Sequence, residues 1–192
     1  MKFEYAFGAT PLDLNEIAGL LPQHLTTQAE LNMWEQANIL EAEKWVFSHK
    51  RSDILSINFC MALHKKMFNK TWQWAGQIRK TDKNIGIMWE QISSQLKILF
   101  DDTKYQIKYH VYLIDELAAR FHHRLVFIHP FANGNGRHAR LMTDVLLYNQ
   151  GANVFTWGQT GLISNSKTRA AYIAALREAD KGNYAALFAF VR

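Results

Sequence analysis

Apolar residues recur at helical spacing along most of the chain. The clearest run is Leu113, Leu117, Phe121 and Leu125, where a four-residue spacing holds over three turns. Similar spacing, less regular in places, predicts further helices over residues 26–45, 57–68, 92–99, 141–147, 169–176 and 183–190. The pattern therefore predicts a mainly α fold.

One stretch breaks this period. Residues 72–76 interrupt the helical spacing, and residues 78–87 carry Asp82, Asn84 and Gly86 between apolar ends. Polar turn residues between apolar ends are typical of a short β-hairpin. The expected architecture is a single helical domain with one short β-hairpin.

Composition narrows the class of protein. The 192 residues, 48% of them hydrophobic, suit one domain with a sizeable core and exclude a disordered or fibrous chain. The net charge of +5 suits a phosphate-bearing ligand. The single cysteine, Cys60, excludes an intramolecular disulfide and a Cys-rich zinc site. No signal peptide opens the chain, and its longest apolar run, residues 184–191, is too short to span a membrane. These features predict a cytoplasmic protein without a membrane partner.

Residues 129–140 combine the features of an anion site. Gly134 and Gly136 let the backbone approach a ligand closely, and a helix is expected to start just after them. The unpaired N–H groups at a helix start are positively polarised and suit phosphate. Arg137 and Arg140 share a face of that helix, while His129 upstream can accept a proton near neutral pH. The alternative is a glycine-rich turn between helices with two surface arginines.

The motif His129-Pro130-Phe131-x-x-Gly134-Asn135-Gly136-Arg137-x-x-Arg140 resembles the signature of Fic domain proteins. The segment that leads into the family's β-hairpin flap resembles residues 74–79. The helix before the family's active loop resembles residues 121–125, and the helix after it resembles residues 169–176. The chain's length and its opening residues 8–12 are most similar to the Fic subfamily called mobile mystery protein B. The resemblance divides the chain into an N-terminal lead-in with an autoinhibitory helix, residues 1–50, and a catalytic core, residues 51–192.

The resemblance implies a protein adenylyltransferase, which moves AMP from ATP to a Ser, Thr or Tyr hydroxyl of a target protein or of itself. It implies that His129 deprotonates the hydroxyl. Gly134 to Gly136, with Asn135, would hold the α- and β-phosphates, while Arg137 and Arg140 neutralise the β- and γ-phosphates. Transfer of another nucleotide or phosphate-containing group is the alternative. The positive charge and the tryptophans also fit a nucleic-acid binder, although less well.

Asn133 departs from the family pattern. The resemblance implies an acidic ligand for Mg²⁺ at this position, and an amide oxygen is a weaker ligand for a hard cation than a carboxylate. Asn133 is therefore expected to bind Mg²⁺ weakly. A catalytically weak nucleotide-binding module is a further alternative.

Residues 26–32 resemble the family's inhibitory motif. Thr26 and Glu30 have the required spacing, but Leu31 stands where glycine or asparagine is expected. The resemblance implies that Glu30 pairs with Arg140 and prevents productive ATP binding. The alternative is a capping box, in which Thr27 and Glu30 close the first turn of a helix.

The resemblance also gives the hairpin a role. Its centre, Thr81, Asp82, Lys83 and Asn84, is expected to present a free strand edge on which a target segment docks by main-chain pairing. A plain surface turn is the alternative.

Overall fold

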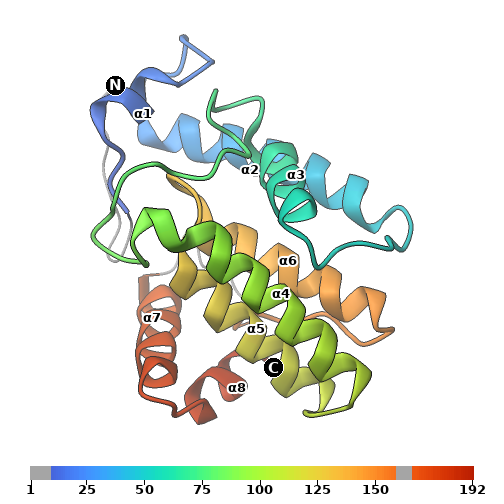
Figure 1. Cartoon of the computed structure of the whole chain (residues 1–192). Helices are drawn as coiled ribbons and strands as arrows, with labels where there is room; N and C mark the ends of the chain where they lie inside the picture. The colour runs from blue at the N-terminus through green and yellow to red at the C-terminus, as the bar shows by residue number, and fades with distance from the viewer. Residues whose placement is uncertain (1–9, 159–165) are drawn as a thin grey trace.

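The computed structural model describes residues 10–158 and 166–192 and confirms a mainly α fold. Figure 1 shows the chain as a succession of helices joined by loops. A short 3-10 turn, Trp89–Gln91, precedes α4. The helices are α1 (Leu14–Ala18), α2 (Gln28–Phe47), α3 (Ile57–Phe68), α4 (Ile92–Lys108), α5 (Ile114–Ile128), α6 (Asn135–Asn149), α7 (Ser166–Asp180) and α8 (Ala185–Val191).

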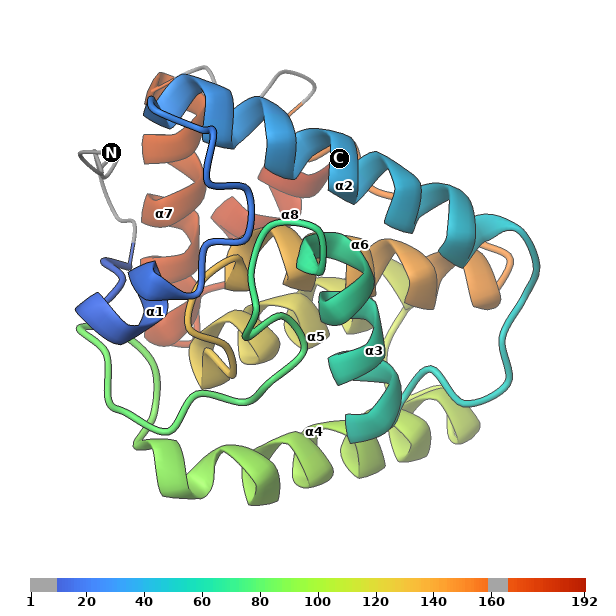
Figure 2. The same ribbon diagram turned by 90° about the horizontal axis from the view of Figure 1, so that it is seen from above.

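The core lies among α2 to α6. In Figure 2, α2 and α4 lie on opposite sides of the molecule, with α3, α5 and α6 between them. Phe68, Phe100, Leu125 and Met142, from four of these helices, are almost fully buried in one cluster. Helices α7 and α8 pack on each other, and with α5 they enclose a second, smaller apolar cluster. The loop between α5 and α6 thus starts and ends in rigid, packed elements.

Helix α2 belongs to the main core. It begins with a capping box, because Thr27 accepts a hydrogen bond from the backbone N–H of Glu30 and the Glu30 carboxylate accepts one from that of Thr27. Leu31, Ile39 and Val46 are buried in the same cluster as α3 and α6. The division of the chain into an autoinhibitory segment, residues 1–50, and a catalytic core, residues 51–192, stays a prediction.

The expected β-hairpin is wrong. Residues 77–88, here called the flap loop, form an irregular loop whose only ladder contact is an isolated antiparallel bridge from Ile78 to Phe131. The buried guanidinium of Arg79 organises it, donating to the carbonyls of His129 and Thr81 at 2.7 Å each and to that of Ile87. These carbonyls are held by a side chain, so the loop needs no cross-strand pairing.

Within the described ranges, none of the helices is both long and apolar enough to cross a membrane.

Candidate active site

The loop between α5 and α6 is rigid. Helix α5 ends at Ile128 and is followed by its C-cap, His129, whose backbone is left-handed (φ 55°, ψ 60°). Phe131 is fully buried and stacks on the ring of His64, with the centroids 3.7 Å apart. The Asn135 side chain accepts from the N–H of Phe131 and donates to its carbonyl, both at 2.8 Å. Asn135 therefore braces the loop, and its side chain is not available for the predicted contact with phosphate.

Gly134 and Gly136 differ in the space and the backbone conformation that each provides. Gly134 has a φ of +78°, and a Cβ there would lie 2.6 Å from the ring of Phe68, so no other residue fits without strain. A Cβ on Gly136 would meet nothing closer than the Arg140 guanidinium, at 3.8 Å. The start of α6 is therefore open on the side of Arg140, where its unpaired N–H groups can meet an anion.

His129 is a neutral base. Its side chain is buried, and burial, followed by the positive charge of Arg79, lowers its pKa to about 4. At neutral pH the imidazole is therefore unprotonated. Its Nε2 atom lies 2.9 Å from the hydroxyl oxygen of Thr10. A neutral imidazole within hydrogen-bond distance of a hydroxyl is the arrangement that general-base chemistry requires.

Acidification from about pH 6.5 to about pH 4 is expected to destabilise the fold. Burial lowers the pKa of His64, that of His122 to about 3, and those of His129 and His138 to about 4. Below pH 6.5 these histidines therefore bind protons in the unfolded chain but not in the folded chain. The free energy of unfolding then decreases as the pH is lowered. Asp144 has the opposite effect on stability. Burial raises its pKa to about 7, so in this pH range the folded chain binds one proton there that the unfolded chain does not. Thermal melting across this pH range measures the effect, and a flat melting temperature would contradict it.

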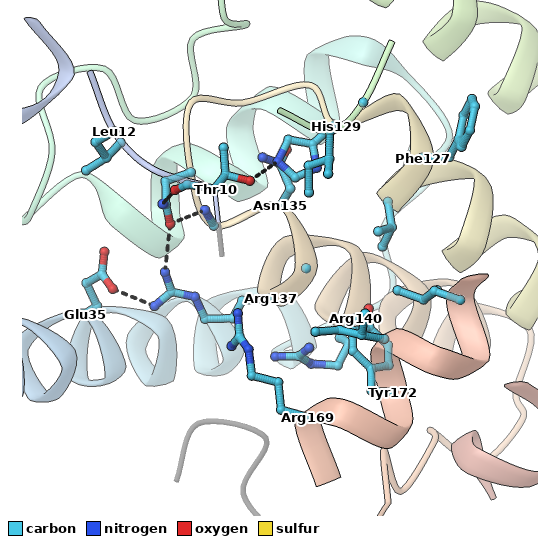
Figure 3. Close-up of a pocket in the computed structure, with 18 of the residues that line it drawn as sticks. Thr10, Leu12, Glu35, Phe127, His129, Asn135, Arg137, Arg140, Arg169 and Tyr172 are labelled. Atoms are coloured by element: carbon cyan, nitrogen blue, oxygen red, sulfur yellow. Dashed lines mark hydrogen bonds and ion pairs between the residues drawn. The ribbon is translucent and has the colours of Figure 1, made fainter. Parts of the chain in front are cut away.

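Three arginines line the same cavity. Figure 3 shows Arg137 and Arg140 of α6 together with Arg169 of α7, all lining a cavity of about 520 Å³ with the start of α6. Burial lowers the pKa of Arg140, and burial with the charge of Arg137 lowers that of Arg169. An anion bound among them would relieve this electrostatic strain. The cavity has the size of a small-ligand pocket.

A family model described as Fic/DOC family matches residues 54–147, which include the loop from His129 to Arg140. The chain belongs to the Fic/DOC family. It is 32% identical over 139 residues to the protein adenylyltransferase fic-1 of Caenorhabditis elegans, covering 70% of this chain and 26% of that protein. The fic-1 protein of Caenorhabditis briggsae is 30% identical over 138 residues, 67% of this chain and 25% of the relative. The chain thus spans about a quarter of the length of these relatives.

Solved Fic structures share the fold. BepC of Bartonella tribocorum, crystallised with bound AMPPNP, superposes with a TM-score of 0.71 at 18% identity, covering 93% of this chain and 96% of that one. Residues 134–508 of C. elegans Fic-1 give a TM-score of 0.66 at 24% identity, covering 91% of this chain and 51% of that one. These similarities confirm the helical Fic architecture.

Asn133 is engaged within this Fic domain. Its Oδ1 accepts from the N–H of Gly134 at 2.6 Å, and its Nδ2 donates to the carbonyl of Thr10 at 3.0 Å. Glu35, which lines the same cavity, is paired with Arg137. In the part of the chain that the structure describes, no three His, Cys, Asp or Glu side chains are grouped to hold a metal. These residues do not fit a magnesium ion held by the protein, so the contacts of Asn133 do not support its predicted role as a metal ligand.

Glu30 does not pair with Arg140, so that expectation is wrong for the described structure. Its carboxylate instead accepts from the N–H groups of Thr26 and Thr27, at 2.7 and 3.0 Å, and from the Thr26 hydroxyl at 3.1 Å. These hydrogen bonds lower the pKa of Glu30. The capping-box alternative is therefore the arrangement that forms, and Thr26 contributes to the cap.

Glu35 is the carboxylate of α2 that reaches the site. It is buried, and its Oε2 lies 2.6 Å from Nη1 of Arg137 (Figure 3). Its Oε1 accepts from the indole N–H of Trp72 at 2.7 Å. Five positions along a helix turn the side-chain direction by about 140°, so Glu30 and Glu35 cannot serve the same face.

The flap loop holds the chain's own first helix. Lys83 donates to the carboxylate of Glu16 in α1 at 2.5 Å, and Asp82 accepts from the backbone N–H of Trp89 at 2.9 Å. Thr81 and Asn84 are exposed. The predicted free strand edge does not exist, because these residues form no strand.

Sequence reasoning missed Thr10, Glu35, Arg169 and Tyr172, although all four line the cavity. Arg169 and Tyr172 lie three positions apart on α7, which places both on one helix face. That spacing in a helix already expected to follow the active loop was the available signal. Thr10 and Glu35 carried no local signal.

Proposed function

We propose that this Fic domain is a protein adenylyltransferase that uses ATP and a Ser, Thr or Tyr hydroxyl of a protein. The observation that carries the proposal is the placement of the neutral His129 imidazole, 2.9 Å from a hydroxyl, beside a helix start and three guanidinium groups. A base for the nucleophile and a site for polyphosphate thus share one cavity. The names of the C. elegans and C. briggsae relatives, protein adenylyltransferase fic-1, support the same reaction.

The mechanism follows from these positions. The acceptor hydroxyl gives its proton to Nε2 of His129 as its oxygen attacks the α-phosphorus. The bond from that phosphorus to the bridging oxygen breaks, and pyrophosphate leaves. The N–H groups at the start of α6 hold the phosphates, and Arg137, Arg140 and Arg169 neutralise them. Positioning and charge neutralisation supply most of the rate in this kind of reaction. No step is assigned to magnesium.

The apolar wall of the cavity suits the nucleobase. Val126 and Phe127 of α5 face the cavity together with Ile173 and Leu176 of α7. Flat bases pack well against apolar side chains at low desolvation cost. ATP thus fits with its base between α5 and α7 and its phosphates at the start of α6.

We also propose that α2 restrains the enzyme through Glu35 instead of Glu30. The ion pair with Glu35 holds Arg137 toward α2 while the nucleotide is absent. Arg137 must leave this carboxylate to neutralise phosphate, so the pair competes with ATP.

Incubation with ATP carrying a label on either the α- or the γ-phosphate tests the reaction. We expect label on protein from α-labelled ATP and none from γ-labelled ATP, because pyrophosphate leaves. Label from γ-labelled ATP would indicate phosphoryl transfer, the alternative group-transfer reaction. If ATP binds but neither labelled protein nor free AMP is formed, the domain is a nucleotide-binding module.

A further inference from the structure

A hydroxyl of this chain already contacts the imidazole of His129. Thr10 lies 119 positions before His129 in the sequence, yet its hydroxyl oxygen is 2.9 Å from His129 Nε2 in a buried contact. Its backbone carbonyl accepts from Asn133 at 3.0 Å, so the loop holds it at two points (Figure 3).

The segment after Thr10 is fixed by the fold. Pro11 restricts Thr10 to an extended backbone, and Leu12 is buried in the main core. Helix α1 then packs on the flap loop and on the residues that precede it, because Glu16 accepts from Lys83 at 2.5 Å and its carbonyl accepts from the Trp74 indole at 3.0 Å. Lys83, one of the flap residues expected to dock a target, thus binds this chain's own segment.

Thr10 is also the hydroxyl best placed among those that line the cavity. The described lining residues include one other hydroxyl, that of Tyr172, which lies 2.8 Å from Nε2 of His122. Of the two, only Thr10 contacts the catalytic base.

We propose that Thr10 is an acceptor of this enzyme, adenylylated in cis; the inference rests on the proposed function. The Thr10 oxygen attacks the α-phosphorus of ATP and its proton passes to Nε2 of His129. The bond to the bridging oxygen breaks, pyrophosphate leaves, and a phosphodiester joins Thr10 to AMP. Atoms and charge balance with no further reactant.

The test uses the full chain, α-labelled ATP and Mg²⁺, with the labelled residue identified by peptide mass mapping. We expect label on Thr10 in the wild type, loss of that label in Thr10→Ala, and its retention at the same position in Thr10→Ser. His129→Ala should carry none. In a mixture of wild-type and His129→Ala chains, which intact mass distinguishes, only the wild-type chain should gain AMP, because the reaction is in cis.

Other outcomes separate the two proposals. Label on other residues, with Thr10 unmodified in the wild type, would overturn the inference and leave the adenylyltransferase assignment standing. AMP on the His129→Ala chain in the mixture would overturn the cis reaction. Absence of labelled protein and of pyrophosphate in every variant would overturn the proposed function and the inference with it.

Discussion

Replacing His129 with alanine is expected to lower the rate of AMP transfer by about 10²–10⁴-fold, the usual contribution of a general base. ATP affinity should change little, because Nε2 of His129 contacts the hydroxyl of Thr10, while the phosphates are proposed to bind elsewhere in the cavity, at the arginines and the start of α6. Single-turnover transfer and equilibrium ATP binding, measured on the same preparation, separate the two effects.

A second variant controls for the backbone at this position. His129 has a φ of 55°, a conformation that asparagine tolerates better than alanine. His129→Asn should therefore keep the loop ordered and still lack the base, so it should be as inactive as His129→Ala. ATP affinity that falls as steeply as the rate in both variants would contradict the role of a base.

Glu35→Gln is expected to raise ATP affinity by about tenfold, equivalent to about 1.4 kcal/mol, and to raise AMP transfer with it. Glutamine keeps an oxygen for the Trp72 indole but removes the charge that holds Arg137. The guanidinium can then turn to the phosphates. Without nucleotide, the variant should be less stable than the wild type, because Arg137 loses its partner in a partly buried site.

The matched control for this variant is Glu30→Gln. Glu30 lies on the same helix but caps its first turn and has no ion pair with Arg137 or Arg140 among the described contacts. Its substitution should weaken the cap and leave ATP affinity unchanged. Calorimetric ATP titration of both variants decides between the carboxylates. A gain in affinity for Glu30→Gln alone would favour the original inhibitory assignment.

The helices and the active loop were predictable because their signals are local. The four-residue spacing begins at Leu113, the N-cap of α5, and its other members, Leu117, Phe121 and Leu125, lie within the helix (Ile114 to Ile128). Residues of the loop motif stabilise the loop themselves, because the Asn135 side chain hydrogen-bonds to both backbone groups of Phe131 and Gly134 adopts the positive φ. Neighbours in sequence make these contacts, so spacing alone encodes them.

The flap loop was mispredicted because one buried side chain, that of Arg79, sets its conformation. Local polarity at Asp82 and Asn84 favoured a hairpin, yet the Arg79 guanidinium captures carbonyls within the loop and that of His129. A buried cation that needs several acceptors overrides a weak turn signal. Nothing near Arg79 in the sequence indicates that it is buried.

The sequence by itself determined most of the helices and the Fic motif that starts at His129, and it offered the capping box of α2 only as an alternative to the inhibitory pairing of Glu30. Only the tertiary structure decided which side chains complete the site. Glu35 meets Arg137 across 102 positions, and Thr10 meets His129 across 119. Such pairs depend on how whole helices pack and on which face each one buries, and that choice is made by the collective burial of apolar surface in the core.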